Sequence, residues 1–264
     1  MRVFASLLAA SLALPGAAPA EAGPRRVASL NLCTDELLLL LAAPEQIASV
    51  THLSQQEAET PLWRQARLYP RNDGSLLSVA EQRPDLIVTM GGGTRDRLGI
   101  AGRLGMKVVD LGFAQTLGDV SENIRRLAGA IGRPEAGAAL LRRVTALIES
   151  RPPLRTDTIW LGGGGRTVTA TGLEAQWMAL AGLRQRPLQG DRVPLETLIA
   201  SPPALLLRSD YRAGQYSSQQ RWLTHPAARH AASLRTLPTD GRRWTCMGPL
   251  MIEEIERLRR ETAR

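Results

Sequence analysis

Strand-like and helical segments alternate through both halves of this chain, and that order limits the possible fold more than any other feature. In the first half, apolar runs typical of strands stand at 26–30, 47–50, 85–90 and 106–111, separated by helical patterns at 34–41, 76–82 and 94–104. After residue 150, strand-like runs recur at 158–161, 167–170, 204–207 and 234–237, with helical patterns at 173–181, 195–200 and 250–260. Alternation of this kind predicts parallel α/β sheets.

The middle of the chain interrupts this rhythm because it is helical throughout. One apolar stripe with helical spacing runs over 120–131 and a second over 140–148. Between them, Gly132-Arg133-Pro134 predicts a kink or a break. We therefore predict an α/β protein of two lobes with central parallel sheets, at 24–118 and 151–264, joined by one long backbone helix over 119–150.

Two of these helices carry capping signals at their predicted starts. Thr34 can cap the helix after the first strand, and Asp35 and Glu36 then lie in its first turn, where the helix dipole favours acidic side chains. Asp119, with Glu122 three residues later, forms a capping-box-like start for the connecting helix. The acids at both starts are therefore explained locally, by the helices that they begin.

The first twenty residues have the three parts of a secretory signal. Arg2 precedes a short apolar run over 3–14, and the segment ends in Ala18-Pro19-Ala20, a small-x-small cleavage site. The run is too short to span a bilayer, which takes about 20 apolar residues. We expect a signal peptide over 1–20 that is removed after Ala20, which predicts a soluble protein exported to the periplasm.

The charge pattern argues against a nucleic-acid partner. The chain carries 33 Lys and Arg against 25 Asp and Glu, and Lys107 is its only lysine. These arginines are spread through the sequence and aromatic residues make up 4% of it, whereas nucleic-acid-binding proteins usually gather basic and stacking side chains on one face. An almost pure arginine bias is typical of GC-rich coding, so we expect no nucleic-acid binding.

No catalytic motif stands out. The glycine run over 162–165 follows a strand but lacks the G-K-[ST] of a phosphate loop, and neither G-x-S-x-G nor H-E-x-x-H occurs. Cys33 can be imagined as a nucleophile, but no local signature supports this role. Three histidines and two cysteines leave little from which to build a metal site. We expect no enzyme activity, no metal site and no cofactor.

Several blocks in a fixed order give the sequence a family resemblance. They are R-V-A-S-L-N at 26–31, D-E-L-L at 35–38, A-P-E-Q-I at 43–47, L-L-S-V-A-E-Q-R-P-D-L-I-V at 76–88, L-G-M-K-V-V at 104–109, L-E-T-L at 195–198 and S-P-P-A-L-L-L at 201–207. Together they resemble the substrate-binding proteins of ABC importers for iron–siderophores and vitamin B12. The resemblance covers nearly all of the chain after the signal segment.

This resemblance implies a bilobed fold on a stiff helical backbone, with the ligand held between the lobes. Ligands of open α/β sheets lie beyond the carboxyl ends of the strands. Guanidinium groups there would pair with anionic oxygens, and aromatic faces would cover an apolar macrocycle. The ligand-binding candidates at these ends are Asn31, Cys33, Arg95, Arg166, Arg208, Tyr211, Arg242, Trp244 and Cys246.

The same resemblance implies a permease in the inner membrane as partner. Members of the family dock through one acidic residue on each lobe, and the matching positions here are Asp96 and Glu196. Two complementary charges orient a complex even where each ion pair is weak. Asp96 is shorter than the glutamate usual at this position.

The two cysteines depart from the family pattern and leave three readings open. Cys33 and Cys246 can form a covalent link between the lobes, which requires α-carbons within about 7 Å. One of them can instead place a thiol beside a bound metal chelate, or both can be inert packing residues.

The sequence as a whole predicts a monomeric periplasmic receptor that binds a metal chelate, either a ferric siderophore or a cobalamin-type corrinoid, for an ABC importer. Receptors for bare zinc or manganese fit less well, since such sites need several converging imidazoles and carboxylates. An exported α/β enzyme, such as a hydrolase using Cys33, is the alternative of a different class. A chelate-binding protein that signals rather than transports would look the same in sequence.

Overall fold

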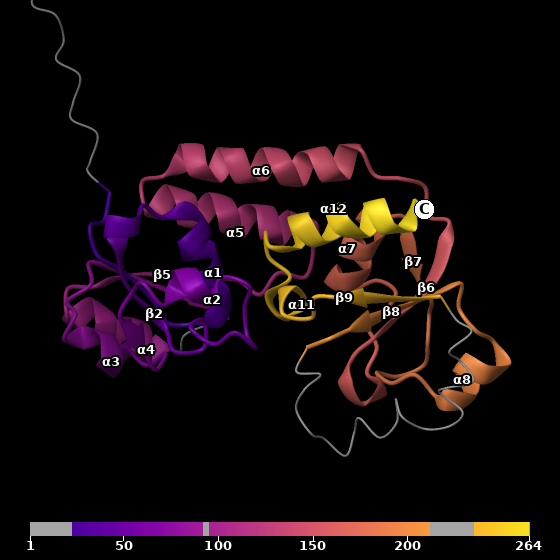
Figure 1. Cartoon of the computed structure of the whole chain (residues 1–264). Coiled ribbons are helices and arrows are strands. Elements are labelled where there is room, and N and C mark those ends of the chain that lie inside the picture. The colour runs from indigo at the N-terminus through magenta and orange to yellow at the C-terminus, as the bar shows by residue number, and fades with distance from the viewer. Residues whose placement is uncertain (1–22, 92–94, 212–234, 264) are drawn as a thin grey trace, which may run out of the picture.

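The structure is a computed structural model that describes residues 23–91, 95–211 and 235–263. Figure 1 shows two lobes, each built on its own sheet, beneath a layer of helices. Since every strand pairing inside these sheets is parallel, the predicted α/β fold class is confirmed. The predicted signal peptide over 1–20 lies outside the described residues.

The first lobe contains a five-stranded sheet of order β3-β2-β1-β4-β5. Its strands are β1 (Val27–Ser29), β2 (Ile47–Thr51), β3 (Arg71–Asn72), β4 (Leu86–Met90) and β5 (Lys107–Leu111). Its helices are α1 (Leu32–Leu41), α2 (Trp63–Ala66), α3 (Leu76–Ala80) and α4 (Arg95–Arg103), with a 3₁₀ turn, η1, at Pro44–Gln46. The strand order reverses between β1 and β4, so the crevice typical of such sheets lies beyond the carboxyl ends of these two strands.

The second lobe contains a four-stranded sheet of order β7-β6-β8-β9. Its strands are β6 (Thr156–Leu161), β7 (Leu183–Gln185), β8 (Leu205–Ser209) and β9 (Thr236–Thr239). Its helices are α7 (Leu173–Leu180), α8 (Leu195–Ala200), α11 (Arg243–Cys246) and α12 (Met251–Thr262), with a 3₁₀ turn, η2, at Gly163–Gly165. The order of this sheet reverses between β6 and β8.

The strand predicted over 167–170 is wrong. These residues form a loop that side chains tie to the sheet: the Thr167 hydroxyl donates to the Trp160 carbonyl at 2.8 Å, and the Gln185 amide donates to the Val168 carbonyl at 3.2 Å. The β-prone residues that suggested a strand instead bond to side chains and backbone of the sheet, and they do not pair with a neighbouring strand.

The connecting segment is two helices rather than one continuous helix. α5 (Leu117–Ala130) ends before Gly132, which has a φ of +67°, and α6 (Pro134–Glu149) begins with a proline at its first position. The chain reverses within these few residues, and the two helices pack against each other along their length (Figure 1). The prediction of one backbone helix over 119–150 is therefore wrong. The helix that runs from the first lobe to the second is α6, and α5 packs beneath it (Figure 1).

Both predicted caps lie a few residues too far along the chain. The N-cap of α1 is Asn31, whose side-chain oxygen accepts a hydrogen bond from the Cys33 amide at 2.8 Å; Thr34 is inside the helix. The N-cap of α5 is Thr116, which forms a capping box with Asp119. The Glu36 side chain is consequently a full turn into α1, away from the solvent-exposed start at which it was expected.

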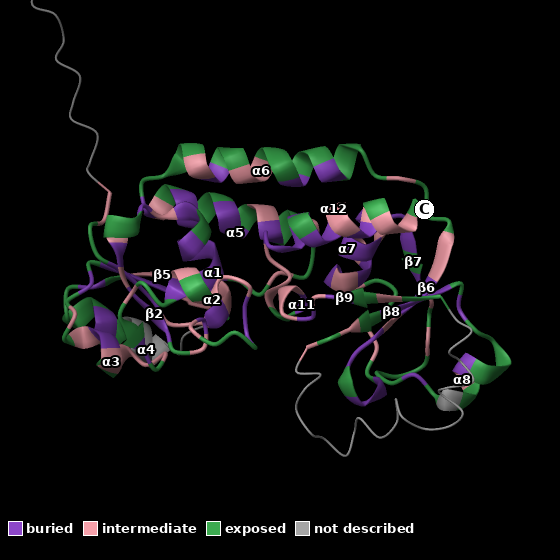
Figure 2. Ribbon diagram, viewed as in Figure 1, coloured by how far each residue is buried: buried purple, intermediate pink, exposed green. Residues whose placement is uncertain are grey.

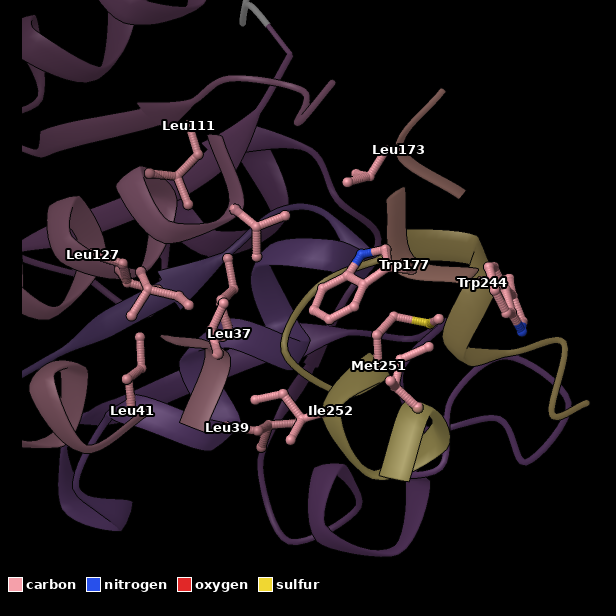
Figure 3. Close-up of a cluster of buried hydrophobic side chains, with 14 of the residues drawn as sticks. Leu37, Leu39, Leu41, Leu111, Leu127, Leu173, Trp177, Trp244, Met251 and Ile252 are labelled. Carbon is pink, nitrogen blue, oxygen red and sulfur yellow. The ribbon is translucent and has the colours of Figure 1, made fainter. Parts of the chain in front are cut away.

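One hydrophobic core extends across both lobes. Figure 3 shows Leu37 of α1 near Trp177 of α7 and Met251 of α12, and all three side chains belong to the same buried cluster. The Trp177 indole also donates to the Met247 carbonyl at 2.9 Å. Figure 2 shows that the outer face of α6 is exposed, while α1 beneath it is mostly buried. The lobes are therefore packed together at their junction as well as joined by the chain.

Candidate functional site

A pocket of about 210 Å³ lies where the two lobes meet. From the first lobe it is lined by α1, by the residue that ends β4, by the loop after β5 and by α5. From the second lobe it is lined by α11 and the loop that follows it. The lining residues are Cys33, Glu36, Leu37, Met90, Phe113, Ala114, Gln115, Val120, Asn123, Thr245, Cys246, Met247, Gly248 and Pro249.

A disulfide between Cys33 and Cys246 forms part of the wall of this pocket. Cys33 is near the start of α1 and Cys246 ends α11, so the bond joins the lobes across 213 residues of chain, with α-carbons 5.2 Å apart. Of the three readings of these cysteines, the covalent link between lobes is the one that the structure shows. It fixes the distance between the two walls of the pocket at this point.

The mouth of the pocket carries an exposed aromatic ring. Phe113, two residues after β5, is 62% exposed and lies against Gly91, whose φ is +87°. A Cβ on residue 91 would come within 2.1 Å of the ring, so the ring can take this position only over a glycine. The Met90 and Met247 thioethers add polarizable apolar surface from opposite lobes. This wall suits a flat apolar ligand surface.

Glu36 is the ionisable group of the pocket. Its side chain is 2% exposed, and one carboxyl oxygen, Oε1, has no hydrogen-bond partner among the described residues. Burial raises the pKa of Glu36 to about 8; a hydrogen bond with Thr60 and the charge of Arg243 oppose this rise, while Asp35 and Asp240 add to it. A buried carboxyl oxygen without a partner is costly, and groups of this kind gather at functional sites.

Asp35 is also buried, but it has a structural partner. Its carboxylate accepts hydrogen bonds from the Thr51 amide at 3.0 Å and from the Thr51 hydroxyl, which ties α1 to the end of β2. Burial raises the pKa of Asp35 to about 7, against the lowering effect of hydrogen bonds from Ser29, Thr51 and Ser54. Asp35 does not line the pocket.

Two hydrogen bonds join the lobes beside the disulfide. The Tyr211 hydroxyl donates to a Glu59 carboxylate oxygen at 2.8 Å. The Arg242 guanidinium donates to the Glu57 carbonyl at 3.0 Å while also pairing with Asp240 at 2.8 Å. Tyr211 and Arg242, both predicted as ligand-binding residues, therefore make contacts between the lobes.

The other predicted residues are spread more widely. Asn31 caps α1, and Trp244 is 6% exposed, with its indole N–H donated to the Thr239 hydroxyl at 2.7 Å. Arg166 is exposed and pairs with Asp191 at 3.4 Å, and Arg208 is exposed on β8. Of the described predicted residues, only Cys33 and Cys246 line the pocket. Arg95 and Asp96 open α4, but their side chains lie outside the described part of the structure.

Sequence reasoning missed Glu36, Met90, Phe113 and Met247 as members of the pocket. Met90 and Phe113 could have been found, because they end or closely follow two strands whose carboxyl ends meet at the same crevice. Glu36 had no such signal, since an acid near a helix start is already explained by the helix dipole. Met247 follows α11, a single helical turn that the sequence pattern did not predict.

Among residues 23–91, 95–211 and 235–263, no group of three or more His, Cys, Asp or Glu side chains is placed to hold a metal ion. No helix in these ranges has both the length and the apolar character needed to cross a membrane.

Solved structures with the same fold include periplasmic binding proteins. The haem-binding protein HutB of Vibrio cholerae has a TM-score of 0.69 at 16% identity, covering 90% of this chain and 99% of its own. The vitamin B12-binding protein BtuF of Vibrio cholerae has a TM-score of 0.60 at 16% identity, with coverage of 90% and 96%. The siderophore-binding protein BauB, solved with acinetobactin and ferric iron, has a TM-score of 0.67 at 12% identity, with coverage of 89% and 93%.

At the level of sequence, comparison with curated proteins finds no significant match. A family model for periplasmic binding proteins matches residues 27–236, from the first strand of one lobe to the last strand of the other. This match spans most of the chain, including the first-lobe wall of the interlobe pocket, and ends before α11. The chain belongs to the periplasmic binding protein family.

Proposed function

We propose that this chain is the substrate-binding component of an ABC importer for a metal chelate. In this proposal a monomer, exported by a signal peptide cleaved after Ala20, holds the chelate at the pocket between its lobes. It then delivers the cargo, chemically unchanged, to a permease in the inner membrane. The chelate is cargo rather than a resident cofactor.

The observation that carries the proposal is a pocket whose walls come from both lobes at the crevice of the first sheet. Open α/β sheets bind ligands at this position. The wall combines Phe113, Met90 and Met247 with one buried carboxyl group, which is the pattern of a small-molecule site: mainly apolar, with few polar groups. A metal chelate with an organic periphery offers matching apolar surface.

The structural relatives support a chelate as the ligand class. HutB binds haem, BtuF binds vitamin B12, and BauB binds ferric iron in complex with acinetobactin; all three ligands are metal ions wrapped in organic ligands. These three ligands differ in shape and charge but share an organic rim around a metal. That rim, rather than the bare ion, is what the apolar wall of this pocket is suited to contact.

The alternative of a cysteine-dependent hydrolase is disfavoured by the disulfide. The nucleophile in such enzymes is a thiolate, and Cys33 is bonded to Cys246. Binding without turnover is therefore the expected behaviour.

A fluorescence titration tests the proposed function. Five tryptophans report on the chain, and Trp244 and Trp177 lie in the core beside the lobe junction. The protein exported to the periplasm of a host bacterium should show saturable quenching by at least one of haemin, cyanocobalamin or a ferric siderophore, with Kd below about 10 μM, near −7 kcal/mol. Recovered cargo should have an unchanged mass. Absence of binding across this panel, or a converted product, would overturn the proposal.

We propose that Asp96 and Glu196 dock the receptor on its permease. Asp96 is in the first turn of α4 and Glu196 is exposed near the start of α8. In Figure 1 these helices lie on different lobes, both on the side of the molecule away from α6. Two acids so placed would meet two basic groups of a permease and fix its orientation.

Charge reversal tests this docking. The D96K/E196K variant should bind cargo as the wild type does and fail to stimulate uptake by membranes that contain the cognate permease. The matched control is E149K, which reverses an exposed acid at the end of α6 on the opposite side of the molecule. Normal uptake with D96K/E196K, or an equal loss with E149K, would contradict the assignment.

A further inference from the structure

Polar groups in the wall of the pocket differ in whether the protein already supplies their hydrogen-bond partners. The Asn123 amide donates to the Gly112 carbonyl at 2.8 Å. The Gln115 backbone is held at both ends, by the Asp119 carboxylate at 2.9 Å and by the Gln176 amide at 3.2 Å. The Glu36 carboxyl differs from both, since it lines the pocket, is almost fully buried and has an oxygen that no described group satisfies.

The cations near this carboxyl are already engaged. Arg243 donates to the Leu250 carbonyl at 2.7 Å and pairs with Glu253 at 3.0 Å and Asp240 at 3.3 Å. Arg242 pairs with Asp240 and donates to the Glu57 carbonyl. Neither guanidinium lines the pocket. Among the described residues that line the pocket, a ligand carboxylate would meet Glu36 and no cation to compensate for it.

The groups that face Glu36 come from three parts of the chain. Asp35 is its neighbour on α1, Thr60 lies in the loop before α2, and Asp240 and Arg243 come from the segment between β9 and α11. One positive and two negative groups thus act on this carboxyl. The local field favours a ligand group that carries a hydrogen-bond donor and disfavours one that carries negative charge.

The pocket is too small for a complete chelate. Its volume of about 210 Å³ is below the ~300–1,000 Å³ typical of sites that enclose a drug-sized ligand. It accommodates an edge or a side arm of the cargo, with Phe113 at the mouth against the adjoining flat surface.

Resting on the function proposed above, we propose that Glu36 is a specificity-determining residue that accepts a hydrogen bond from an amide N–H or hydroxyl on the rim of an uncharged chelate. Above about pH 8, where this carboxyl is ionised, the pocket then discriminates against chelates whose rim carries carboxylates. A ligand donor placed against Oε1 would supply the hydrogen bond that this oxygen lacks. Hydrogen bonds to charged acceptors are stronger than those to neutral ones.

The direction of the pH effect follows from linkage. A donor stabilises the ionised form of Glu36, so binding of a donor-bearing cargo releases a proton from this carboxyl. Affinity for such a cargo should rise between pH 6 and pH 9 and level off above it. In E36Q, which cannot ionise, affinity should be independent of pH over this range.

The test compares two groups of probes on wild type, E36Q and E36L. Cyanocobalamin and a ferric trihydroxamate siderophore carry amide or hydroxyl donors on their rims, and haemin and ferric citrate carry carboxylates. At pH 9 the wild type should prefer the first group, and E36L should lose roughly tenfold in affinity for it, the size expected for one charge-assisted bond. E149Q, at an exposed acid on α6, is the matched control and should bind as the wild type does.

The outcomes separate this inference from the proposed function. Tighter binding of the carboxylate-bearing probes, or binding of the first group that neither Glu36 variant nor pH alters, would overturn the role of Glu36 and leave chelate binding intact. Failure of every probe to bind would overturn the proposed function itself. Circular dichroism and thermal unfolding of each variant verify that it is folded, and the comparison of E36Q with wild type across pH does not depend on the stability of E36L.

Discussion

The roles that the sequence suggests for Asp35 and Glu36 depend on the residue at which α1 starts. Had α1 begun at Thr34, both acids would lie in an exposed first turn, where they stabilise the dipole. With Asn31 as the cap, Asp35 lies in the first turn and Glu36 lies beyond it; both are buried, and burial raises the pKa of each. Their protonated forms are therefore favoured in the folded state over much of the neutral range.

This burial makes stability depend on pH in a definite direction. The folded state retains protons that the unfolded state releases above about pH 4.5, because the folded pKa values are raised to about 7 for Asp35 and about 8 for Glu36. The free energy of unfolding should fall as pH rises from about 4.5 to 8 and then level off. E36Q should reduce this fall by a few kcal/mol.

Urea unfolding of wild type and E36Q at intervals from pH 4.5 to 8.5 measures the effect. D73N is the matched control: the pKa of the exposed Asp73 is lowered to about 2 by hydrogen bonds with Ser75 and Ser78, so its titration lies below this range. D73N should leave the slope as it is in the wild type. Equal slopes in wild type and E36Q would contradict the burial argument.

Phe113 is the residue whose role can be tested with least harm to the fold. Its ring is mostly exposed at the mouth of the pocket, so F113A removes little buried surface. We expect F113A to lower chelate affinity about tenfold, because aromatic contacts of this kind contribute roughly 0.5–1.5 kcal/mol beyond the area that they bury. Titration of L68A, which truncates an exposed leucine in the first lobe outside the pocket, is the comparison and should match the wild type.

At the scale of elements, the close contact between α5 and α6 depends on Gly137. A Cβ there would lie 2.5 Å from the Cβ of Ala128, and neither group has a torsion that could relieve the contact. The helices would have to separate, and overpacking of this kind typically costs about 1–3 kcal/mol. G137A should therefore destabilise the protein even though alanine favours helix more than glycine does.

Gly129, on α5, provides the matched control for this substitution. It lies in the same helix pair, and a Cβ on it would meet nothing within 4 Å. G129A should be neutral or stabilise the protein by up to about 1 kcal/mol, the difference in helix propensity. Thermal unfolding of the two variants side by side decides the matter: equal melting temperatures would show that α5 and α6 do not depend on this contact.

At the scale of the whole molecule, the disulfide, the core and hydrogen bonds such as those of Tyr211 and Arg242 hold the lobes together. A bond that closes a loop of 213 residues constrains the unfolded chain strongly, and removal of a native disulfide typically costs about 2–5 kcal/mol. The C33S/C246S variant should unfold at lower urea than the oxidised wild type. It should retain its fold in water, because the buried cluster around Trp177 spans both lobes.

A reducing agent provides the internal check on this prediction. Reduction should lower the urea midpoint of the wild type towards that of C33S/C246S and leave the variant unchanged. Equal urea midpoints for the wild type and C33S/C246S under oxidising conditions would show that the disulfide does not stabilise the protein.

The element pattern was largely readable from the sequence, but with boundaries displaced by a few residues. α8 begins and ends where the sequence predicted, and the sheets follow the predicted alternation. The errors arose where side chains made contacts outside their own element. Thr167 and Val168 are held by Trp160 and Gln185, so their β-prone composition produced a tethered loop.

What the sequence determined by itself is therefore the local part: the alternation that gives two parallel sheets, the break at Gly132-Arg133-Pro134 and the family. The alternation and the break depend on hydrophobic period and backbone preference, which act over a few residues, and the family depends on a resemblance of short motifs in a fixed order. Only the tertiary structure decided that Cys33 meets Cys246, that Glu36 faces a pocket without a partner, and that Phe113 lies on Gly91. Each of these depends on contact between segments that are far apart in the chain. The hydrophobic pattern of one segment does not predict where another segment will lie.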